Sequence, residues 1–356
     1  MLQVRFIIAR IVIAGPIFVL VKSFEGDYEI SHQHQSDWPG NCQTGESQSP
    51  INIDTSKTDK RRTLGESLIV HGYQKNLDAD LKNNGHTISV TIRDPDALKN
   101  IWVQDGGLSL SKNVFYAAHF HWGLNNSKGS EHTIDGKAYP MEAHLVHWNK
   151  DIGENITDAK QKLTRISLHV LGVHFKIGKM SQSLEHIFQR IKGMRHNQFL
   201  PLAKQIQLKH LLPNNKQAFY RYEGSLTTPS KITKSVNGNS ETGCHEIVKW
   251  TVFKEPIEIS QKQMDIMRTA THQPHEDINK TEPVGNNFRE TKPVNERTVL
   301  DVDMLDDDIL DDCEHDTCDP DDDDDQGGDK KQAEEDDDYE DAEGHDKKFL
   351  LIRVAK

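Results

Sequence analysis

Short runs in which apolar and polar residues alternate dominate the body of the chain and predict strands. In six runs the apolar side chains recur with a period of two or form a short apolar block bounded by turn residues. These runs are Leu68 to Gly72, His86 to Arg93, Val114 to His121, His144 to Trp148, Ile166 to Val173 and Val248 to Phe253. Gly and Asn residues between them, as in Asn83-Asn84-Gly85 and Asp105-Gly106-Gly107, indicate turns. The pattern therefore predicts a body built mainly from strands.

Helical periodicity is clear in limited places, such as Ser183 to Lys192 and Gln261 to Arg268. We therefore expect a few helices at the periphery of a β-dominated body that spans residues 24–300. Large β folds of this length often form one domain. The polar, turn-rich segment from Ser230 to Gly243 predicts an exposed loop.

The N-terminal segment has the character of a signal peptide. Arg5 and Arg10 precede an apolar run that Gly15 and Pro16 interrupt, and small or β-branched residues end it near Ser23. We expect residues 1–23 to be cleaved and the protein to be secreted; an uncleaved signal anchor is the alternative. The rest of the chain contains no apolar run long enough to span a membrane, so no span is expected in the mature protein.

Residues 301–356 have a different composition from the body. The stretch from Asp301 to Asp346 holds 25 acidic residues and two lysines, whereas the whole chain has a net charge of −13. The body is therefore mildly basic. With so few apolar residues, this acidic tail is expected to be disordered in isolation. No basic cluster is interleaved with aromatic residues, so nucleic-acid binding is not expected.

Four cysteines and three glycosylation triplets fit an exported protein. Three disulfide pairings are open; the economical one joins Cys42 to Cys244 across the body and Cys313 to Cys318 in the tail. The triplets begin at Asn125, Asn155 and Asn279, and each is a weak signal by itself.

Three histidines are candidates for a metal site. Residues two apart in a strand point to the same face, so His119 and His121 are expected to aim their imidazoles together. His144 lies in the next predicted strand and can supply a third imidazole. Three imidazoles with an open fourth position are typical of a catalytic zinc site. A chain with 19 histidines also places some two apart by chance, so the spacing alone leaves both interpretations open.

Five further motifs or residues along the chain accompany the histidines. They are Gln48-Ser49-Pro50-Ile51, Asn83-Asn84-Gly85-His86, Gly129-Ser130-Glu131-His132-Thr133, Glu142 and Gly224-Ser225-Leu226-Thr227-Thr228-Pro229. Together they resemble the alpha-class carbonic anhydrases over nearly all of residues 24–300. Cys42 in Gly-Asn-Cys and Cys244 before Trp250 resemble the disulfide partners of the secreted branch. The resemblance implies a β-dominated α+β fold, a single domain on a large twisted, mainly antiparallel central sheet with peripheral helices.

The resemblance also implies a reaction. One Zn²⁺ held by His119, His121 and His144 would activate water for attack on carbon dioxide, giving bicarbonate and a proton; carbonic anhydrase is itself the usual example of this zinc chemistry. Thr227 would accept from the activated water and donate to Glu131, because a carboxylate can only accept. The alternative is that Thr227 is an ordinary turn residue before Pro229.

Other positions acquire expected roles from the same resemblance. His86 would be the proton shuttle, with an unperturbed pKa of about 6.5 suited to the task, and Glu142 would orient His144. Thr228 would help to hold bicarbonate. The apolar wall for carbon dioxide would consist of Val146, Val170, Leu226, Val248 and Trp250, all of which also suit a plain core.

Two departures from the family pattern stand out. Ala117 occupies the position where the family usually has a glutamine, two residues before the first zinc histidine. His119 can therefore lack its partner, and weaker zinc affinity or slower turnover is expected. The segment Ser230 to Gly243 is longer than the family generally has and can shape the rim of the site.

The acidic tail suggests a second task. Carboxylate oxygens suit calcium, and a flexible polyanion can bind calcium ions weakly or lie on a calcium carbonate surface. An exported bicarbonate-producing enzyme with such a tail resembles the carbonic anhydrases of calcified extracellular matrices, such as mollusc shells. A merely solubilising tail is the alternative. At the level of function, the alternative is a catalytically weak or inactive family relative that acts as an acidic calcium-binding matrix protein.

Overall fold

The computed structural model describes residues 32–61, 67–106, 111–232, 241–272 and 280–303. The chain divides into two units, Met1–Asp311 and Asp312–Lys356, and every described residue belongs to the first. The predicted signal peptide, Asn279, Cys313 and Cys318 lie outside the described residues, as does the acidic tail beyond Asp303.

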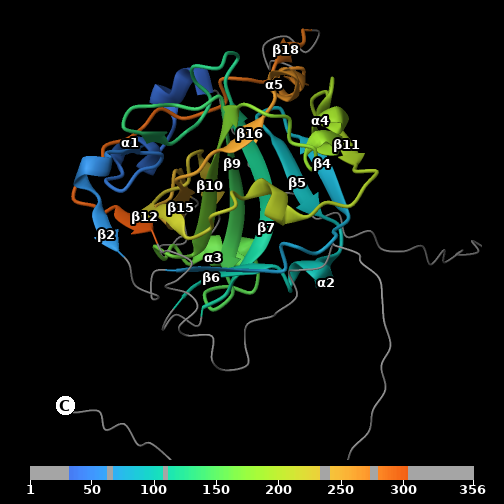
Figure 1. Cartoon of the computed structure of the whole chain (residues 1–356). Coiled ribbons are helices and arrows are strands. Elements are labelled where there is room, and N and C mark those ends of the chain that lie inside the picture. The colour runs from blue at the N-terminus through green and yellow to red at the C-terminus, as the bar shows by residue number, and fades with distance from the viewer. Residues whose placement is uncertain (1–31, 62–66, 107–110, 233–240, 273–279, 304–356) are drawn as a thin grey trace, which may run out of the picture. The chain divides into compact units, whose positions relative to one another are not determined.

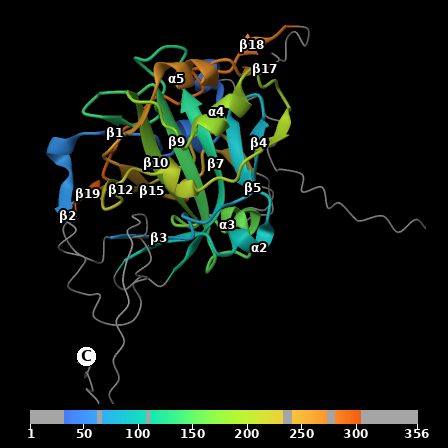
Figure 2. The same ribbon diagram turned by 45° about the vertical axis from the view of Figure 1, so that its right-hand side comes forward.

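A 13-stranded mixed sheet forms the frame of the described body (Figure 1). Its main path runs β11-β4-β5-β7-β9-β10-β15-β12-β19-β2; β6 joins β3 to β7, and β16 pairs with β10. Only β10 with β15, β10 with β16 and β19 with β2 are parallel pairs in this sheet. Figure 2 shows its central strands side by side from a second direction. The predicted large, mainly antiparallel central sheet is confirmed.

The strands of this sheet are β2 (Asp59–Arg61), β3 (Leu68–His71), β4 (Ala79–Asn83), β5 (Ile88–Ile92), β6 (Trp102–Asp105), β7 (Asn113–Trp122), β9 (Met141–Asn149), β10 (Leu168–Ile177), β11 (Phe199–Pro201), β12 (Ala218–Gly224), β15 (Val248–Phe253), β16 (Ile257–Ile259) and β19 (Leu300–Asp303). Three two-stranded sheets pair β1 (Asn52–Ile53) with β8 (Thr133–Ile134), β13 (Ser230–Ile232) with β14 (Glu241–Gly243), and β17 (Thr271–His272) with β18 (Glu282–Pro283). All six runs that the alternation predicts contain or overlap an observed strand.

The helices are short and lie around the sheet (Figure 1). They are α1 (Asn41–Thr44), α2 (Pro95–Leu98), α3 (Ile156–Gln161), α4 (Glu185–Ile191) and α5 (Gln261–Met267), with 3-10 turns η1 (His32–Asp37), η2 (Thr55–Lys57) and η4 (Leu208–Leu211). Ser260 begins α5 with a capping box, its side chain accepting from Gln263 N while the Gln263 side chain accepts from Ser260 N. The two predicted helices are therefore present as α4 and α5. No helix in the described part of the chain is both long and apolar enough to cross a membrane.

Alternation along β7 and β9 separates an apolar face from the face that carries the histidines. Ala118, Phe120 and Trp122 belong to the larger core cluster, as do Ala143 and Leu145 of β9. The intervening residues of both strands point to the opposite face, because successive strand residues alternate. There a second cluster, which includes Val170, Val248 and Trp250, provides the apolar surroundings.

The segment Ser230 to Gly243 is not wholly a loop, because its two ends pair as β13 and β14. The hairpin base lies against Gly40, where a Cβ atom would come within 2.5 Å of Thr242 O. Gly40 also has a φ of +57°, so a residue with a side chain would be strained there. Alternation was too weak over three residues to reveal these strands.

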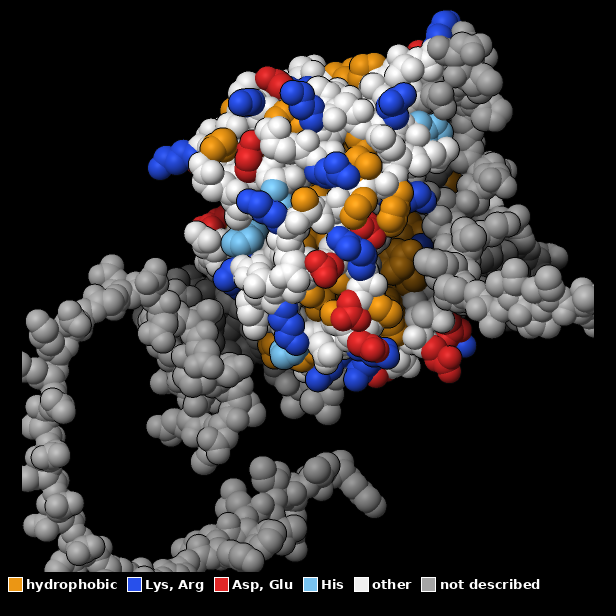
Figure 3. Space-filling view, turned by 90° about the vertical axis from the view of Figure 1, so that its right-hand side faces the viewer, with side chains coloured by type: hydrophobic (Ala, Val, Ile, Leu, Met, Phe, Trp, Pro, Cys, Tyr) orange, Lys and Arg blue, Asp and Glu red, His pale blue; other side chains and the backbone are white. Residues whose placement is uncertain are grey.

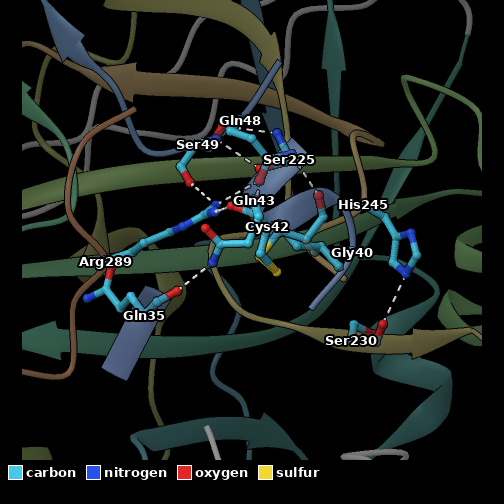
Figure 4. Close-up of a disulfide and its surroundings, with 12 residues drawn as sticks. Gln35, Gly40, Cys42, Gln43, Gln48, Ser49, Ser225, Ser230, His245 and Arg289 are labelled. Atoms are coloured by element: carbon cyan, nitrogen blue, oxygen red, sulfur yellow. Dashed lines mark hydrogen bonds between the residues drawn. A yellow bond between two sulfur atoms is a disulfide. The ribbon is translucent and has the colours of Figure 1, made fainter. Parts of the chain in front are cut away.

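A disulfide joins Cys42 to Cys244, as expected (Figure 4). The two cysteines form a small apolar cluster with Trp38. Next to it, the buried Arg289 guanidinium donates to Cys42 O and Ser49 O, both at 2.7 Å. Burial lowers the pKa of Arg289 to about 10, so it is still a cation at neutral pH. Beside the disulfide, the hydrogen bonds of Arg289 thus connect α1 to the segment before β1.

Candidate metal centre

The register of β7 and β9 brings the three candidate histidines together. His119 lies directly opposite His144 in this antiparallel pair, and His121 shares the face of His119. The ring centroids are 5.0 Å apart for His119 and His121, 5.2 Å for His119 and His144, and 4.5 Å for His121 and His144. One nitrogen from each ring lies within 4.8 Å of the others, so the group can hold one metal ion.

Hydrogen bonds at the far sides of two rings fix which nitrogen faces the centre. His121 Nδ1 donates to Asn287 O at 2.7 Å, which leaves Nε2 with a lone pair. His144 Nε2 donates to Glu142 Oε1 at 2.8 Å, which leaves Nδ1 free to bind. Such orientation of ligand imidazoles by carbonyl and carboxylate groups is a common property of metal sites.

Burial keeps two of the imidazoles neutral. It lowers the pKa of His119 well below 6.5, and the neighbouring His121 and His144 lower it further. Burial also lowers the pKa of His121, although Glu131 opposes the shift. A neutral imidazole is the form that binds a metal, so both residues are ready to do so at neutral pH.

The chemistry of these donors fits zinc. His121 Nε2 is buried and has no hydrogen-bond partner among the described residues. A buried polar atom without a partner costs free energy, and a metal ion would supply the missing interaction. Three imidazole nitrogen donors on neighbouring strands, with no fourth protein ligand in the described group, correspond to a zinc site that retains an open position.

Glu142 accepts four hydrogen bonds behind the histidines. Its Oε1 accepts from His132 Nδ1 and His144 Nε2, and its Oε2 accepts from the backbone N–H groups of Glu131 and His132, all at 2.8–2.9 Å. Burial alone would raise the pKa of Glu142, but His132 and His144 outweigh it, so the pKa lies well below its usual range. The carboxylate is therefore a fixed acceptor.

The network continues away from Glu142. A hydrogen bond of 2.7 Å joins His132 Nε2 to the Tyr222 hydroxyl. The same hydroxyl is hydrogen-bonded to Ser49 Oγ at 2.9 Å. Ser49 and Ser225 in turn exchange hydrogen bonds between their side chains and backbones. His144 is thus linked through buried groups to the segment that precedes Thr227.

His119 differs from the other two histidines. Its side chain forms no hydrogen bond with any residue that the structure describes, and its contacts are with the rings of His121 and His144. Ala117, two residues earlier on β7, has only a methyl group to offer. A β-bulge separates Phe115 from Ala117 and leaves Tyr116 exposed.

Glu131 and Thr227 are both buried, but no hydrogen bond joins them in the described structure. Glu131 Oε1 accepts from Arg289 N at 2.8 Å and lies 3.5 Å from His121 Nδ1, whereas Oε2 has no partner among the described residues. The predicted proton relay through Thr227 therefore stays a prediction. Glu131 Oε2 retains the capacity to accept the bond that the relay requires.

His86 follows a tight turn whose geometry depends on Asn84. Asn84 Oδ1 accepts from the N–H groups of His86 and Thr87, at 2.9 and 2.8 Å. Gly85 between them has a φ of +90°, a value that favours glycine. The side-chain oxygen of Asn84 therefore holds the turn that precedes His86.

The residues predicted to form the apolar wall belong to one apolar cluster, and one of them contacts a candidate metal ligand. Trp250 makes an edge contact with His144, its ring centroid 4.8 Å away, and donates from Nε1 to Ser225 O. The members of the cluster are Val146, Val170, Leu226, Val248 and Trp250. Thr228 is partly buried beside buried Thr227.

The face of the molecule seen in Figure 3 carries charges of both signs, with apolar side chains between them. Two glycosylation triplets lie in the described part of the chain. Asn125 is exposed, and its Oδ1 accepts from Ser127 N and Oγ. Asn155 is exposed at the start of α3, where its side chain caps Asp158 N.

Sequence reasoning missed Asn287 and Arg289, which contact His121 and Glu131 from a segment without regular structure. They precede β19 by more than ten residues and follow no apolar alternation. It also assigned no role to His132, although the residue lay within a quoted motif. A polar segment without periodic apolar residues does not reveal from its sequence that it is buried. Periodic apolar residues reveal this only for strands and helices.

Comparisons with known proteins agree with this geometry. The family model for eukaryotic-type carbonic anhydrases matches residues 32–302. The chain is 33% identical over 266 residues to putative carbonic anhydrase 3 of Caenorhabditis elegans, covering 74% of this chain and 92% of that protein. It is 31% identical to carbonic anhydrase 6 of Mus musculus over 283 residues, or 78% and 80% of the two chains. It is also 30% identical to the human carbonic anhydrase-related protein over 259 residues, or 72% and 83%.

Proposed function

The chain belongs to the eukaryotic-type carbonic anhydrase family, and from this premise we propose that it is a zinc-dependent enzyme that hydrates carbon dioxide reversibly to bicarbonate and a proton. One observation carries the proposal: three histidine nitrogens converge on one point, and the orphaned Nε2 of His121 is buried there. In the proposal His119, His121 and His144 hold Zn²⁺. The ion would supply a Lewis acid that makes a water molecule a nucleophile near neutral pH.

The surrounding residues have distinct tasks in this proposal. Glu142 and the Asn287 carbonyl hold His144 and His121 in the tautomers that bind metal. Glu131 Oε2 accepts from the Thr227 hydroxyl, so that this hydroxyl can accept a hydrogen bond in turn and orient the nucleophile. The apolar wall formed by Val146, Val170, Leu226, Val248 and Trp250 accommodates carbon dioxide, which has no need of charged partners.

Proton release is assigned to His86 and substrate contact to Thr228. His86 is partly exposed at the turn after β4, so its imidazole can exchange protons with solvent buffer. Thr228 would contact bicarbonate next to Thr227.

Carbon dioxide hydration measured by stopped flow tests the enzymatic proposal. We expect a rate that depends on stoichiometric zinc and that His144→Ala abolishes, together with zinc binding. Full activity in His144→Ala would refute the ligand assignment, and no zinc-dependent rate in the unaltered protein would favour a non-enzymatic family relative. The presence of all three histidines in one group that could hold a metal ion argues against that alternative.

We further propose that the protein is secreted into an extracellular matrix, where it supplies bicarbonate for calcium carbonate deposition. The mature chain begins after residue 23 in this proposal, and residues 301–356 bind calcium ions weakly or contact the mineral. Support comes from the 25 acidic residues between Asp301 and Asp346 and from the disulfide between Cys42 and Cys244. Glycans at Asn125, Asn155 and Asn279 and a second disulfide between Cys313 and Cys318 belong to the same proposal.

A further inference from the structure

Asn287 contacts a candidate metal ligand, the strand that carries it and the candidate proton acceptor at the same time. Its carbonyl oxygen accepts from His121 Nδ1 at 2.7 Å. Its side-chain Oδ1 accepts from Trp122 N at 2.7 Å, while Nδ2 donates to Phe120 O at 3.1 Å and to His86 O at 2.7 Å. The residue is buried, with 4% of its surface exposed. It therefore connects the turn of His86 to both neighbours of His121.

These contacts require an amide side chain. A backbone N–H can only donate and a carbonyl can only accept, so the three partners fix which atom of Asn287 is nitrogen and which is oxygen. Aspartate has the same shape, but it lacks the donor for His86 O and Phe120 O. Alanine lacks all three side-chain bonds and keeps only the main-chain carbonyl that faces His121.

Neighbouring residues hold the Asn287 segment without contacting the histidines. Gln35 donates from Nε2 to Phe288 O and accepts at Oε1 from Glu290 N, both at 3.0 Å. Thr87 provides a separate link, since its hydroxyl donates to Phe120 O at 2.5 Å. Loss of the Asn287 side chain would therefore remove its hydrogen bond to the carbonyl of His86, while the adjacent Thr87 stays attached to β7.

We propose that Asn287 is a positioning residue that couples metal retention at His121 to the placement of His86. Through its side chain it sets the distance of the His86 turn from the metal-binding strand, and through its carbonyl it fixes the His121 tautomer. The part that concerns proton transfer rests on the proposed function, whereas the part that concerns metal retention and the His86 backbone does not.

The test compares the full-length protein with Asn287→Ala and with a matched control, Gln35→Ala. Zinc release to a chelator, hydrogen exchange of the segment that contains His86, and hydration kinetics at low buffer are measured for each. In Asn287→Ala we expect zinc release about ten-fold faster, as for other residues that orient metal ligands, and faster exchange at His86. We also expect kcat to fall more than kcat/KM, with free imidazole restoring kcat because it replaces a misplaced proton acceptor.

Gln35→Ala should leave the zinc release rate and the ratio of kcat to kcat/KM unchanged. Asn287→Asp, which keeps only the bond from Trp122 N, should reproduce the effects on exchange and kcat, and it carries the test if the alanine variant does not fold. Unaltered zinc release and unaltered exchange at His86 would overturn the inference, as would equal losses in kcat and kcat/KM without rescue by imidazole. If the unaltered protein shows no hydration, the proposed function fails, while zinc release and exchange still decide the role of Asn287.

Discussion

The two imidazoles of the His-x-His pair are held in different ways, although the sequence presents them as equivalents. His121 has a carbonyl partner on its outer nitrogen, whereas His119 has only ring contacts among the described residues. The alternation of β7 was sufficient to predict that both face the same way. It could not predict Asn287 as a partner, because that residue is 166 positions away in the chain.

Restoring a partner to His119 should strengthen zinc binding. We expect Ala117→Gln to slow zinc release by about ten-fold, because an amide two residues earlier on the same strand face can accept from the His119 imidazole and fix its orientation. Competition with a chromophoric chelator measures the change. Ala117→Leu, which adds bulk without an acceptor, is the control; an equal gain in that variant would contradict the explanation.

At the scale of strands, the sequence predicts the elements better than their partners. Strong alternation located β5, β7, β9, β10 and β15, but it did not indicate the bulge at Tyr116. That bulge matters because a one-residue shift exchanges the two faces of a strand. The opposition of His119 and His144 therefore depends on pairing that is set by the whole sheet, whereas the three-residue strands β13 and β14 were too short to predict at all.

A buried histidine of β9 on the side opposite to His144 should make the fold sensitive to acid. Burial lowers the pKa of His147 to about 3, and the neutral ring bonds to the Tyr73 hydroxyl and donates to His169 O. Below pH 6.5 the unfolded chain takes up a proton that the folded chain does not, so stability decreases as pH falls from 6.5 towards 3.

His147→Gln should remove this contribution, since glutamine forms hydrogen bonds but does not titrate. We expect the loss of unfolding free energy between pH 7 and pH 5, measured by urea in the presence of chelator, to be smaller by about 2 kcal/mol than in the unaltered protein. His34→Gln, the same substitution at an exposed histidine, is the matched control. If the unfolding free energy of His147→Gln decreased between pH 7 and pH 5 as much as that of the unaltered protein, the role assigned to His147 would be contradicted.

The disulfide should stabilise the connection between α1 and the segment that follows β14. It closes a loop of 202 residues, and its partners Arg289 and Gln48 bond to Cys42 O and Cys244 O. We expect the double variant Cys42→Ala/Cys244→Ala to lose about 2–5 kcal/mol of unfolding free energy. Denaturant unfolding measures this, and thiol treatment of the unaltered protein should give a comparable loss. Equal stability in both forms would be evidence against a stabilising role.

At the scale of the whole molecule, the acidic composition begins slightly before the folded body ends. The acidic composition begins at Asp301, but β19 continues to Asp303 and pairs with both β12 and β2. Val302 is fully buried, and Asp301 forms an ion pair with Lys254. Composition alone could not reveal this, because an aspartate in a strand and one in a polyanion look the same in sequence. The first acidic residues therefore belong to the sheet.

Two truncations separate the contribution of the tail from that of the sheet. Deleting residues 304–356 should leave carbon dioxide hydration and the melting temperature unchanged, because every described strand is retained. It should markedly reduce calcium binding in titration calorimetry and adsorption to calcium carbonate, because the polyanion is removed. Deleting residues 301–356 should in addition lower stability, since β2 loses its pairing with β19 and the buried Val302 is lost. Mineral adsorption that survives the shorter deletion would mean that the basic body, rather than the acidic tail, contacts the mineral, and the tail would then serve solubility alone.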